Sequence, residues 1–261
     1  MNKQRKKLIG LIATAILAAV IVGAGLSKLA PLWKEMTFYW GERSETELVV
    51  KAHAEEHDIY YAEYPSSLIE LLERNPETMS FVLNYPFRQE LPIDLSEYDL
   101  SQGVPLMMQW DPRWGYLEYG SDVVGITGCG PLCLAMAGYY VTGDEKFSPD
   151  KMVEFASENG YYSPGNGSSW TLISEGGETL GLDVTEIPLV EKRITENLKA
   201  GNPIICAMGK GDFTTSGHYI VLVGLEDGLI RVNDPNSHAN SEKLWAYEDI
   251  ETQIRNLWVI R

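Results

Sequence analysis

Residues 128–137 read Gly-Cys-Gly-Pro-Leu-Cys-Leu-Ala-Met-Ala, an apolar stretch that begins at Cys129 between two glycines. Pro131 suits the first turn of a helix, because the N–H that proline lacks would have no partner there. The stretch therefore predicts an apolar helix over residues 129–141 with Cys129 at its N-terminus. The helix dipole and the unpaired amides at such a position favour the thiolate form of cysteine, which is its nucleophilic form.

A histidine and an aspartate flank two apolar segments in the last quarter of the chain. Residues 218–224 and 229–233 have the composition of β-strands, and an Asp-Gly pair separates them. Asp-Gly is a strong signal for a hairpin turn, so the strands are expected to pair antiparallel and to bring Asp234 back beside His218. A cysteine nucleophile needs a base, and the base needs a third group to orient it. Together with Cys129, these residues are the candidate catalytic triad of a cysteine hydrolase.

Each of the three residues also has a simpler interpretation. Cys129 could be a structural cysteine beside a glycine turn, His218 a core histidine, and Asp234 part of an Asn-Asp-Pro turn. Asn233 is a rival to Asp234 as the group that orients His218, although successive side chains on a strand face opposite ways. No simpler interpretation explains all three residues together.

A tetrahedral intermediate also needs hydrogen-bond donors for its oxyanion. The backbone amide of Cys129 is one candidate, and Gln109, which follows an expected strand over residues 104–108, is the candidate side-chain donor. A surface glutamine is the alternative. Several aromatic residues are candidates either for the walls of a peptide cleft or for core packing: Trp110, Trp114, Tyr116, Tyr119 and Trp170.

The chain has 3 cysteines, an odd number that does not suit a disulfide-built secreted domain. Cys133 and Cys206 lie in apolar segments and are expected to be buried hydrophobic residues, with a disulfide between them left open. Residues 53–57 (HAEEH) carry two histidines on one helix face, but Ala54 stands where the metalloprotease motif needs Glu. We therefore expect a solvated helix face there, and neither a metal nor another cofactor in the enzyme.

Charge and hydropathy divide the 261 residues into three expected parts. The net charge of −16 argues against binding to nucleic acid. Four cations precede residues 8–26, a run without charge that is long enough for one membrane-spanning helix. A cleaved signal peptide is the alternative. In either case the preceding cations direct the rest of the chain out of the cytoplasm. We expect an anchor over residues 1–26, a helical juxtamembrane module over 27–90 and a catalytic domain over 91–261.

The catalytic domain is expected to be α+β, because helical patterns precede strand-like ones. Helices are expected over residues 129–141, 149–158, 170–180 and 194–200, and strands over 203–208, 218–224, 229–233 and 256–260. The juxtamembrane module is expected to contain helices over residues 44–62, from 65, and over 76–83.

Four motifs in order resemble the second branch of the bacteriocin-processing-peptidase-like (double-glycine peptidase-like) cysteine peptidases. They are residues 109–114 (QWDPRW), 128–131 (GCGP), 216–218 (SGH) and 233–237 (NDPNS). The resemblance covers residues 100–261. It implies a papain-like fold, in which the helix bearing the cysteine packs on an antiparallel sheet bearing the histidine and the aspartate. It also implies a Cys129–His218–Asp234 triad with Gln109 in the oxyanion hole, although Gln109 lies further from Cys129 than is usual in papain-like enzymes.

The sequence thus predicts a membrane-anchored, extracytoplasmic cysteine peptidase that hydrolyses peptide or amide bonds, and that is secreted if its N-terminal segment is cleaved. The absence of an organelle address suits a bacterial surface protein, with secreted peptides, surface proteins or cell-wall peptides as substrates. Bacteriocin processors of this family are fused to a transporter and face the cytoplasm, so leader cleavage is not expected here. One alternative is a cell-wall amidase or endopeptidase of the NlpC type, whose usual Asp-Cys-Ser is absent. The other is a catalytically silent surface-binding module. The sequence leaves open the natural substrate and the oligomeric state.

Overall fold

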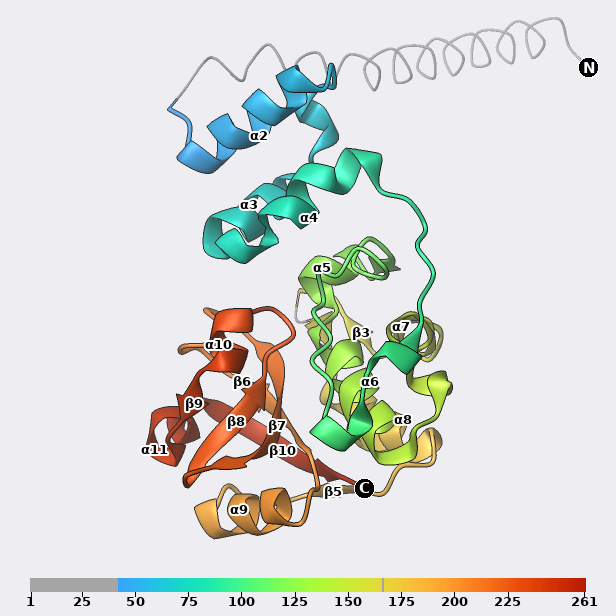
Figure 1. Cartoon of the computed structure of the whole chain (residues 1–261), viewed down its shortest axis with the longest axis vertical. Coiled ribbons are helices and arrows are strands. Elements are labelled where there is room, and N and C mark those ends of the chain that lie inside the picture. Colours follow the sequence, from blue (N-terminus) through green and yellow to red (C-terminus); the bar gives the residue numbers. More distant parts are fainter. Residues whose placement is uncertain (1–41, 166) are drawn as a thin grey trace, which may run out of the picture. The chain divides into compact units, whose positions relative to one another are not determined.

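The computed structural model describes residues 42–165 and 167–261 (Figure 1). Contacts along the chain divide it into two compact units between Glu73 and Arg74. The domain boundaries expected at residues 26/27 and 90/91 stay predictions. Within the described residues, no helix has the length and apolarity needed to cross a membrane. The anchor expected at residues 8–26 lies outside the described residues.

The first unit is helical in its described part. Helix α2 (Glu45–Glu56) begins with a capping box, in which the Ser44 side chain accepts from the Glu47 amide and the Glu47 side chain accepts from the Ser44 amide. The 3₁₀ helix η1 (Tyr61–Glu63) follows, and α3 (Ser66–Arg74) buries four aliphatic side chains along one face. The helices expected from residues 44 and 65 are confirmed, although the first ends earlier than residue 62.

The second unit contains the remaining helices and the main sheet. Its α-helices are α4 (Met79–Asn84), α5 (Val124–Thr127), α6 (Cys129–Thr142), α7 (Pro149–Glu158), α8 (Ser174–Thr179), α9 (Glu191–Lys199), α10 (His238–Glu242) and α11 (Tyr247–Ile250). Its 3₁₀ helices are η2 (Pro76–Thr78), η3 (Tyr85–Phe87), η4 (Leu95–Glu97), η5 (Leu100–Gln102), η6 (Glu145–Phe147), η7 (Trp170–Leu172) and η8 (Glu251–Gln253). The helix expected over residues 170–180 is therefore two short helices, η7 and α8.

The main sheet has the strand order β5-β10-β6-β7-β8-β9 and is antiparallel throughout. Its strands are β5 (Val184–Glu186), β6 (Ile204–Met208), β7 (His218–Glu226), β8 (Leu229–Asn233), β9 (Leu244–Trp245) and β10 (Ile254–Ile260). Two small hairpins lie outside it, β1 (Glu118–Tyr119) with β2 (Asp122–Val123) and β3 (Tyr162–Ser163) with β4 (Gly167–Ser168). All four expected strands of the C-terminal part are present. The sequence analysis did not predict strands β5 and β9, because segments of three and two residues are too short to show an alternation of apolar and polar side chains.

The expected hairpin of β7 and β8 is confirmed. Asp227 and Gly228 form its turn with φ angles of 51° and 86°, the left-handed values that an Asp-Gly hairpin turn requires. Because the two strands pair antiparallel, the first residue of β7 and the last residue of β8 lie at the same end of the sheet. This geometry places His218 and Asp234 as neighbours.

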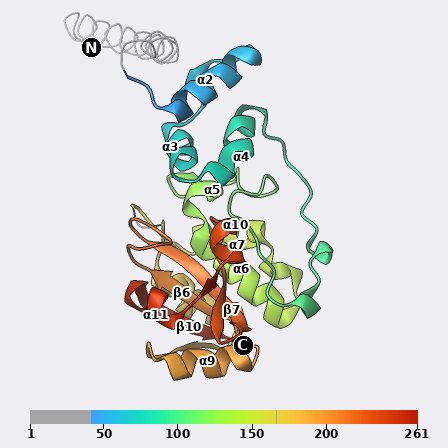
Figure 2. The same ribbon diagram turned by 60° about the vertical axis from the view of Figure 1, so that its left-hand side comes forward.

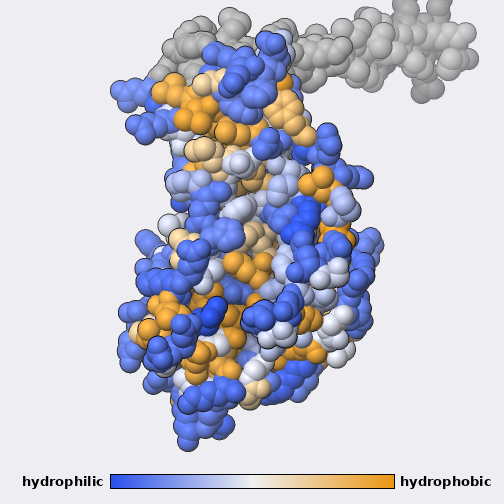
Figure 3. All heavy atoms as spheres, in the orientation of Figure 1, coloured by the Kyte–Doolittle hydropathy of each residue, from blue (hydrophilic) through white to orange (hydrophobic). Residues whose placement is uncertain are grey.

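Two hydrophobic clusters pack against the sheet. Figures 1 and 2 show from two directions the helices that surround the sheet. Helices α6, α7 and α8 pack on one face, and α9 and α11 pack on the other. Cys133 belongs to the first cluster and Cys206 to the second, and both are fully buried. All three cysteines are free, so no disulfide joins these two. Hydrophilic side chains cover most of the surface visible in Figure 3, with small hydrophobic areas between them.

The strand expected over residues 104–108 is not formed, so this prediction was wrong. Side chains, in place of a neighbouring strand, form hydrogen bonds with the backbone of this segment. The Asn233 amide donates to the carbonyls of Val104 and Pro105, at 3.0 Å each. The Met107 amide donates to the sulfur of Met136 at 3.3 Å. Sequence alternation cannot distinguish such a segment from a true strand, because both are extended and partly buried.

Candidate active site

Cys129 begins helix α6, as the glycine-flanked motif predicts. The two glycines serve close packing rather than access to the sulfur. A Cβ at Gly128 would lie 2.5 Å from Cγ1 of Val124, and a Cβ at Gly130 would lie 2.6 Å from the Ser168 side chain. Any larger residue would push α5 or the β4 strand away from the start of α6. The glycines thus allow two elements to converge on the turn that presents the partly exposed thiol of Cys129.

His218 and Asp234 form a buried ion pair. His218 Nε2 and Asp234 Oδ1 lie 2.7 Å apart, and the two side chains are 8% and 1% exposed. Asn233 faces away from this pair, because its amide group binds the carbonyls of Val104 and Pro105. Of the two candidates for orienting His218, Asp234 is therefore the residue in contact with it.

The Asp234 carboxylate is held by further donors. Its Oδ1 also accepts from the Asn236 backbone amide at 2.9 Å, and its Oδ2 accepts from Asn240 Nδ2 at 2.7 Å. A buried carboxylate needs such partners, because an unpaired charge away from water is costly. The donors leave Asp234 Oδ1 directed at the His218 ring and fix the ring's orientation.

The environment of His218 favours the imidazolium. Burial lowers the pKa of His218, but the Asp234 charge, the hydrogen bond with Asp234 and the hydrogen bond with Cys129 together raise this pKa to about 10. The ring thus contacts a carboxylate, and it lines the same pocket as Cys129. A histidine held in this way can exchange a proton with a neighbouring sulfur.

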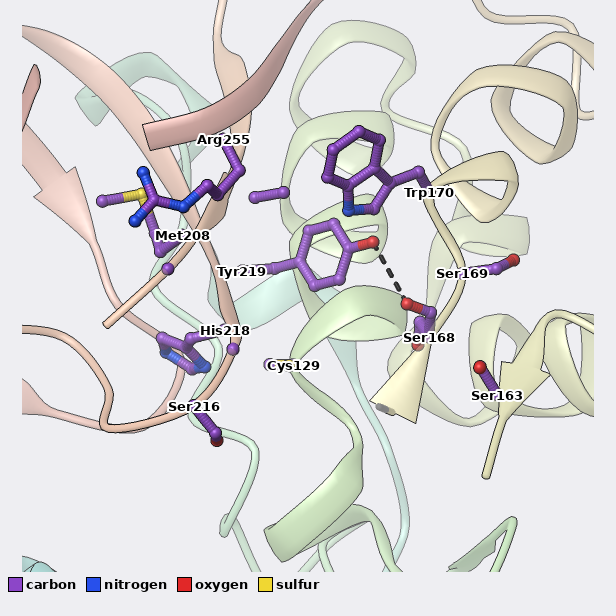
Figure 4. Close-up of a pocket in the computed structure, with 13 residues that line it drawn as sticks. Cys129, Ser163, Ser168, Ser169, Trp170, Met208, Ser216, His218, Tyr219 and Arg255 are labelled. Carbon is purple, nitrogen blue, oxygen red and sulfur yellow. Dashed lines mark hydrogen bonds between the residues drawn. The ribbon is translucent and has the colours of Figure 1, made fainter. Parts of the chain in front are cut away.

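Cys129 and His218 border a pocket of about 350 Å³ (Figure 4). Serine residues on and beside the β3–β4 hairpin form one part of its wall, and the ends of β6, β7 and β10 form another. Trp170 lines the pocket as well. It is the one candidate cleft aromatic that does so, whereas Trp114 and Tyr119 are fully buried in the core. Tyr219 closes the back of the pocket, where its hydroxyl donates to the Ser168 carbonyl at 3.2 Å.

Gln109 does not line this pocket. It is 3% exposed, and its Nε2 donates to the Gly125 carbonyl at 2.8 Å. Its Oε1 is buried and has no hydrogen-bond partner among the described residues. In an uninterrupted α-helix the Gly125 carbonyl would accept from the amide of Cys129, four residues later. Here that carbonyl accepts from Gln109. The role of Gln109 as a direct oxyanion donor stays a prediction.

The sequence analysis did not predict that residues 75–77 contact the loop that follows Asp234. The Glu77 carboxylate accepts from the amides of His238 (2.7 Å) and Ala239 (3.3 Å) and from the Ser237 hydroxyl (3.0 Å). These contacts hold the first turn of α10, the helix that carries Asn240. Nearby, Asn75 Nδ2 donates to the Asn236 carbonyl at 2.5 Å. No local pattern indicates contacts that join residues so far apart in the chain.

We predict that the His218 imidazole stays protonated well above the ordinary histidine range and that Asp234→Asn lowers its pKa. A raised pKa means that the folded state holds the proton more tightly. Its contribution to stability is therefore complete below about pH 6.5, the ordinary value, and disappears as the pH rises through about 10. Titration of the ring signal by NMR, assigned with His218→Ala, checks this. An ordinary pKa in the unsubstituted protein would contradict the geometry.

We predict that Glu77→Gln loosens the loop that holds Asp234, because it weakens the acceptor for the first turn of α10. The expected cost is about 1 kcal/mol, as for loss of a helix cap, together with a lower His218 pKa in the same NMR titration. Glu90→Gln, at an exposed site of the same unit, is the matched control. A His218 pKa that changes equally in both variants would remove the positioning role of Glu77.

Part of the chain is similar to known proteins. Residues 101–260 match the Peptidase_C39 like family. The peptidase domain of Streptococcus ComA, a bi-functional ABC transporter, is 19% identical and has a TM-score of 0.40, with 56% of this chain and 96% of that chain covered. A C39-like peptidase from Bacillus anthracis is 14% identical and has a TM-score of 0.41, with 60% of this chain and 94% of that chain covered.

A search of curated proteins found no match. The family match covers more than half of the chain and includes all the candidate catalytic residues. The chain therefore belongs to the C39-like peptidase family and is a cysteine peptidase.

Proposed function

We propose that this protein is a membrane-anchored peptidase that hydrolyses peptide bonds outside the cytoplasm with Cys129, His218 and Asp234. The observation that carries the catalytic part is the 2.7 Å pair of His218 and Asp234 at a pocket that also contains Cys129. Asp234 holds the ring, and Cys129 lines the same pocket as the ring; a nucleophile, a base and a group that orients the base are what proton exchange with a nucleophile requires.

The proposed reaction has two stages. The Cys129 thiolate, whose proton His218 holds, attacks the carbonyl carbon of a peptide bond, and the C–N bond breaks as His218 gives that proton to the departing amine. Water then attacks the thioester carbonyl and gives a proton to His218, the C–S bond breaks, and the sulfur leaves as the thiolate. Asp234 stays ionised and orients the ring throughout. No redox step and no further reactant are needed.

The papain-like arrangement is part of the proposal. Helix α6, which bears Cys129, packs against β7, which bears His218, and Asp234 directly follows the neighbouring strand β8. Helix α6 thus supplies the nucleophile, and the adjoining end of the sheet supplies the base and the carboxylate that orients it.

The N-terminal charges support the proposed location and substrate. The cations before the apolar run of residues 8–26 favour export of everything after it. Secreted peptides, surface proteins and cell-wall peptides are then within reach of the enzyme.

We predict that an iodoacetamide probe labels Cys129 fastest of the three cysteines at neutral pH. Burial raises the pKa of Cys133 and of Cys206, and both are fully buried, so they serve as internal controls. His218→Ala should slow labelling of Cys129 roughly tenfold or more, because the imidazolium no longer stabilises the thiolate. Mass spectrometry locates and times the label. Slow labelling of Cys129 that is indifferent to His218 would favour the silent binding module instead.

We predict that the full-length protein sediments with membranes and that protease added outside intact cells digests its C-terminal unit. Removal of residues 8–26 should release the protein from the membrane fraction. A C-terminal unit that is protected in intact cells and digested only after lysis would refute the extracytoplasmic location. It would leave the catalytic proposal standing.

A further inference from the structure

Arg255 is a positive charge on the wall of the catalytic pocket. Figure 4 shows its side chain at the end of the pocket that also holds Met208 and Trp170. Among the described residues that line the pocket, it is the one Lys or Arg, and none is Asp or Glu. The positive charge on the pocket wall is opposite in sign to the net charge of the chain, −16.

A break in the sheet directs Arg255 to this position. The pairing of β10 with β6 shifts register between Ile254 and Asn256, so Arg255 is the extra residue of a β-bulge. A bulge changes the direction in which a side chain points, and bulges are common beside active sites. In a regular ladder Arg255 would occupy the place opposite Ala207 that Asn256 takes.

A glycine provides the surface on which the guanidinium rests. A Cβ at Gly209 would lie 2.4 Å from Nε of Arg255 and 2.7 Å from its Cζ, so any side chain there would displace the arginine. Gly209 is buried beneath the arginine, and its amide donates to the Gln253 carbonyl at 2.7 Å. The flat guanidinium thus lies close to the backbone at Gly209.

The charge of Arg255 has no acidic partner in the part of the chain that the structure describes. Its one hydrogen bond there runs from Nη1 to the Thr252 carbonyl at 2.9 Å, and no ion pair includes it. By contrast, Arg113, Arg231 and Arg261 each pair with a carboxylate. A guanidinium has five donors in a planar fork that matches a carboxylate, so most of its donors remain available to a ligand.

We propose that Arg255 binds a carboxylate of the substrate and makes this peptidase selective for peptides that are acidic next to the scissile bond. This inference rests on the proposed function and names the substrate class of the same site. The carboxylate can belong to an acidic side chain or to the C-terminal end of a short peptide. Either would form charge-assisted hydrogen bonds to the guanidinium edge.

Thiol reagents that carry the two kinds of carboxylate test this without a known substrate. The three probes are N-iodoacetyl-glutamic acid α-amide, N-iodoacetyl-glutamine with a free carboxylate, and N-iodoacetyl-glutamine amide as the neutral reference. We expect one acidic probe to alkylate Cys129 about fivefold faster than the neutral one, the upper range for an exposed ion pair. The faster of the two acidic probes identifies the source of the carboxylate. The advantage should shrink in high salt.

Two variants remove the effect in different ways. Arg255→Gln removes the charge, and Gly209→Ala keeps the charge but displaces the side chain. Both should abolish the advantage of the acidic probe. The matched controls are Arg231→Gln, at an exposed arginine outside the pocket, and Gly224→Ala, where a Cβ meets nothing within 4 Å. Both controls should keep the advantage.

The outcomes separate this inference from the proposed function. Equal rates for all three probes, or an advantage that survives both Arg255→Gln and Gly209→Ala, would overturn the role of Arg255. If labelling of Cys129 still depends on His218 in that case, the catalytic proposal stands. An advantage that depends on Arg255, with labelling indifferent to His218, would leave an acidic binding site without catalysis.

Discussion

The structure of this site depends on one buried contact, the 2.7 Å pair between His218 and Asp234. A carboxylate that is 1% exposed is tolerable only with donors around it, so the loop after β8 is arranged to supply them. The amide of Asn236 and the side chain of Asn240 do so, and α10 begins between them. The need for donors to the Asp234 carboxylate thus constrains the β7–β8 hairpin, the loop after it and helix α10.

Local signals in the sequence predict much of this arrangement. Pro131, the Asp-Gly turn and the two apolar strand segments are each sufficient to place an element, because each acts on its own few residues. The hairpin in turn brings His218 and Asp234 to the same end of the sheet without any knowledge of the rest of the chain. Cys129 can be placed at a helix start by the same local reasoning.

The parts that could not be predicted depend on contacts between distant segments. Residues 104–108 have the pattern of a strand but bond to the Asn233 side chain. The sequence does not show that Val124 and Ser168 occupy the positions where side chains at Gly128 and Gly130 would lie. Arg255 enters the pocket only because β10 shifts register by one residue, and a bulge of this kind leaves no mark in the hydropathy pattern. Such features become visible only when the partner segment is known.

The contacts of Asn75 and Glu77 also bear on where an autonomous enzyme fragment can begin. The family match starts at residue 101, and the change in sequence pattern lies near residue 91. A fragment starting at either point would lack the acceptor for α10 and the ring of Phe81, which stacks on Tyr116 with centroids 4.4 Å apart. A piece that keeps the support of Asp234 therefore has to include Asn75 and Glu77, well before the homologous region. The second compact unit, which begins at Arg74, includes both.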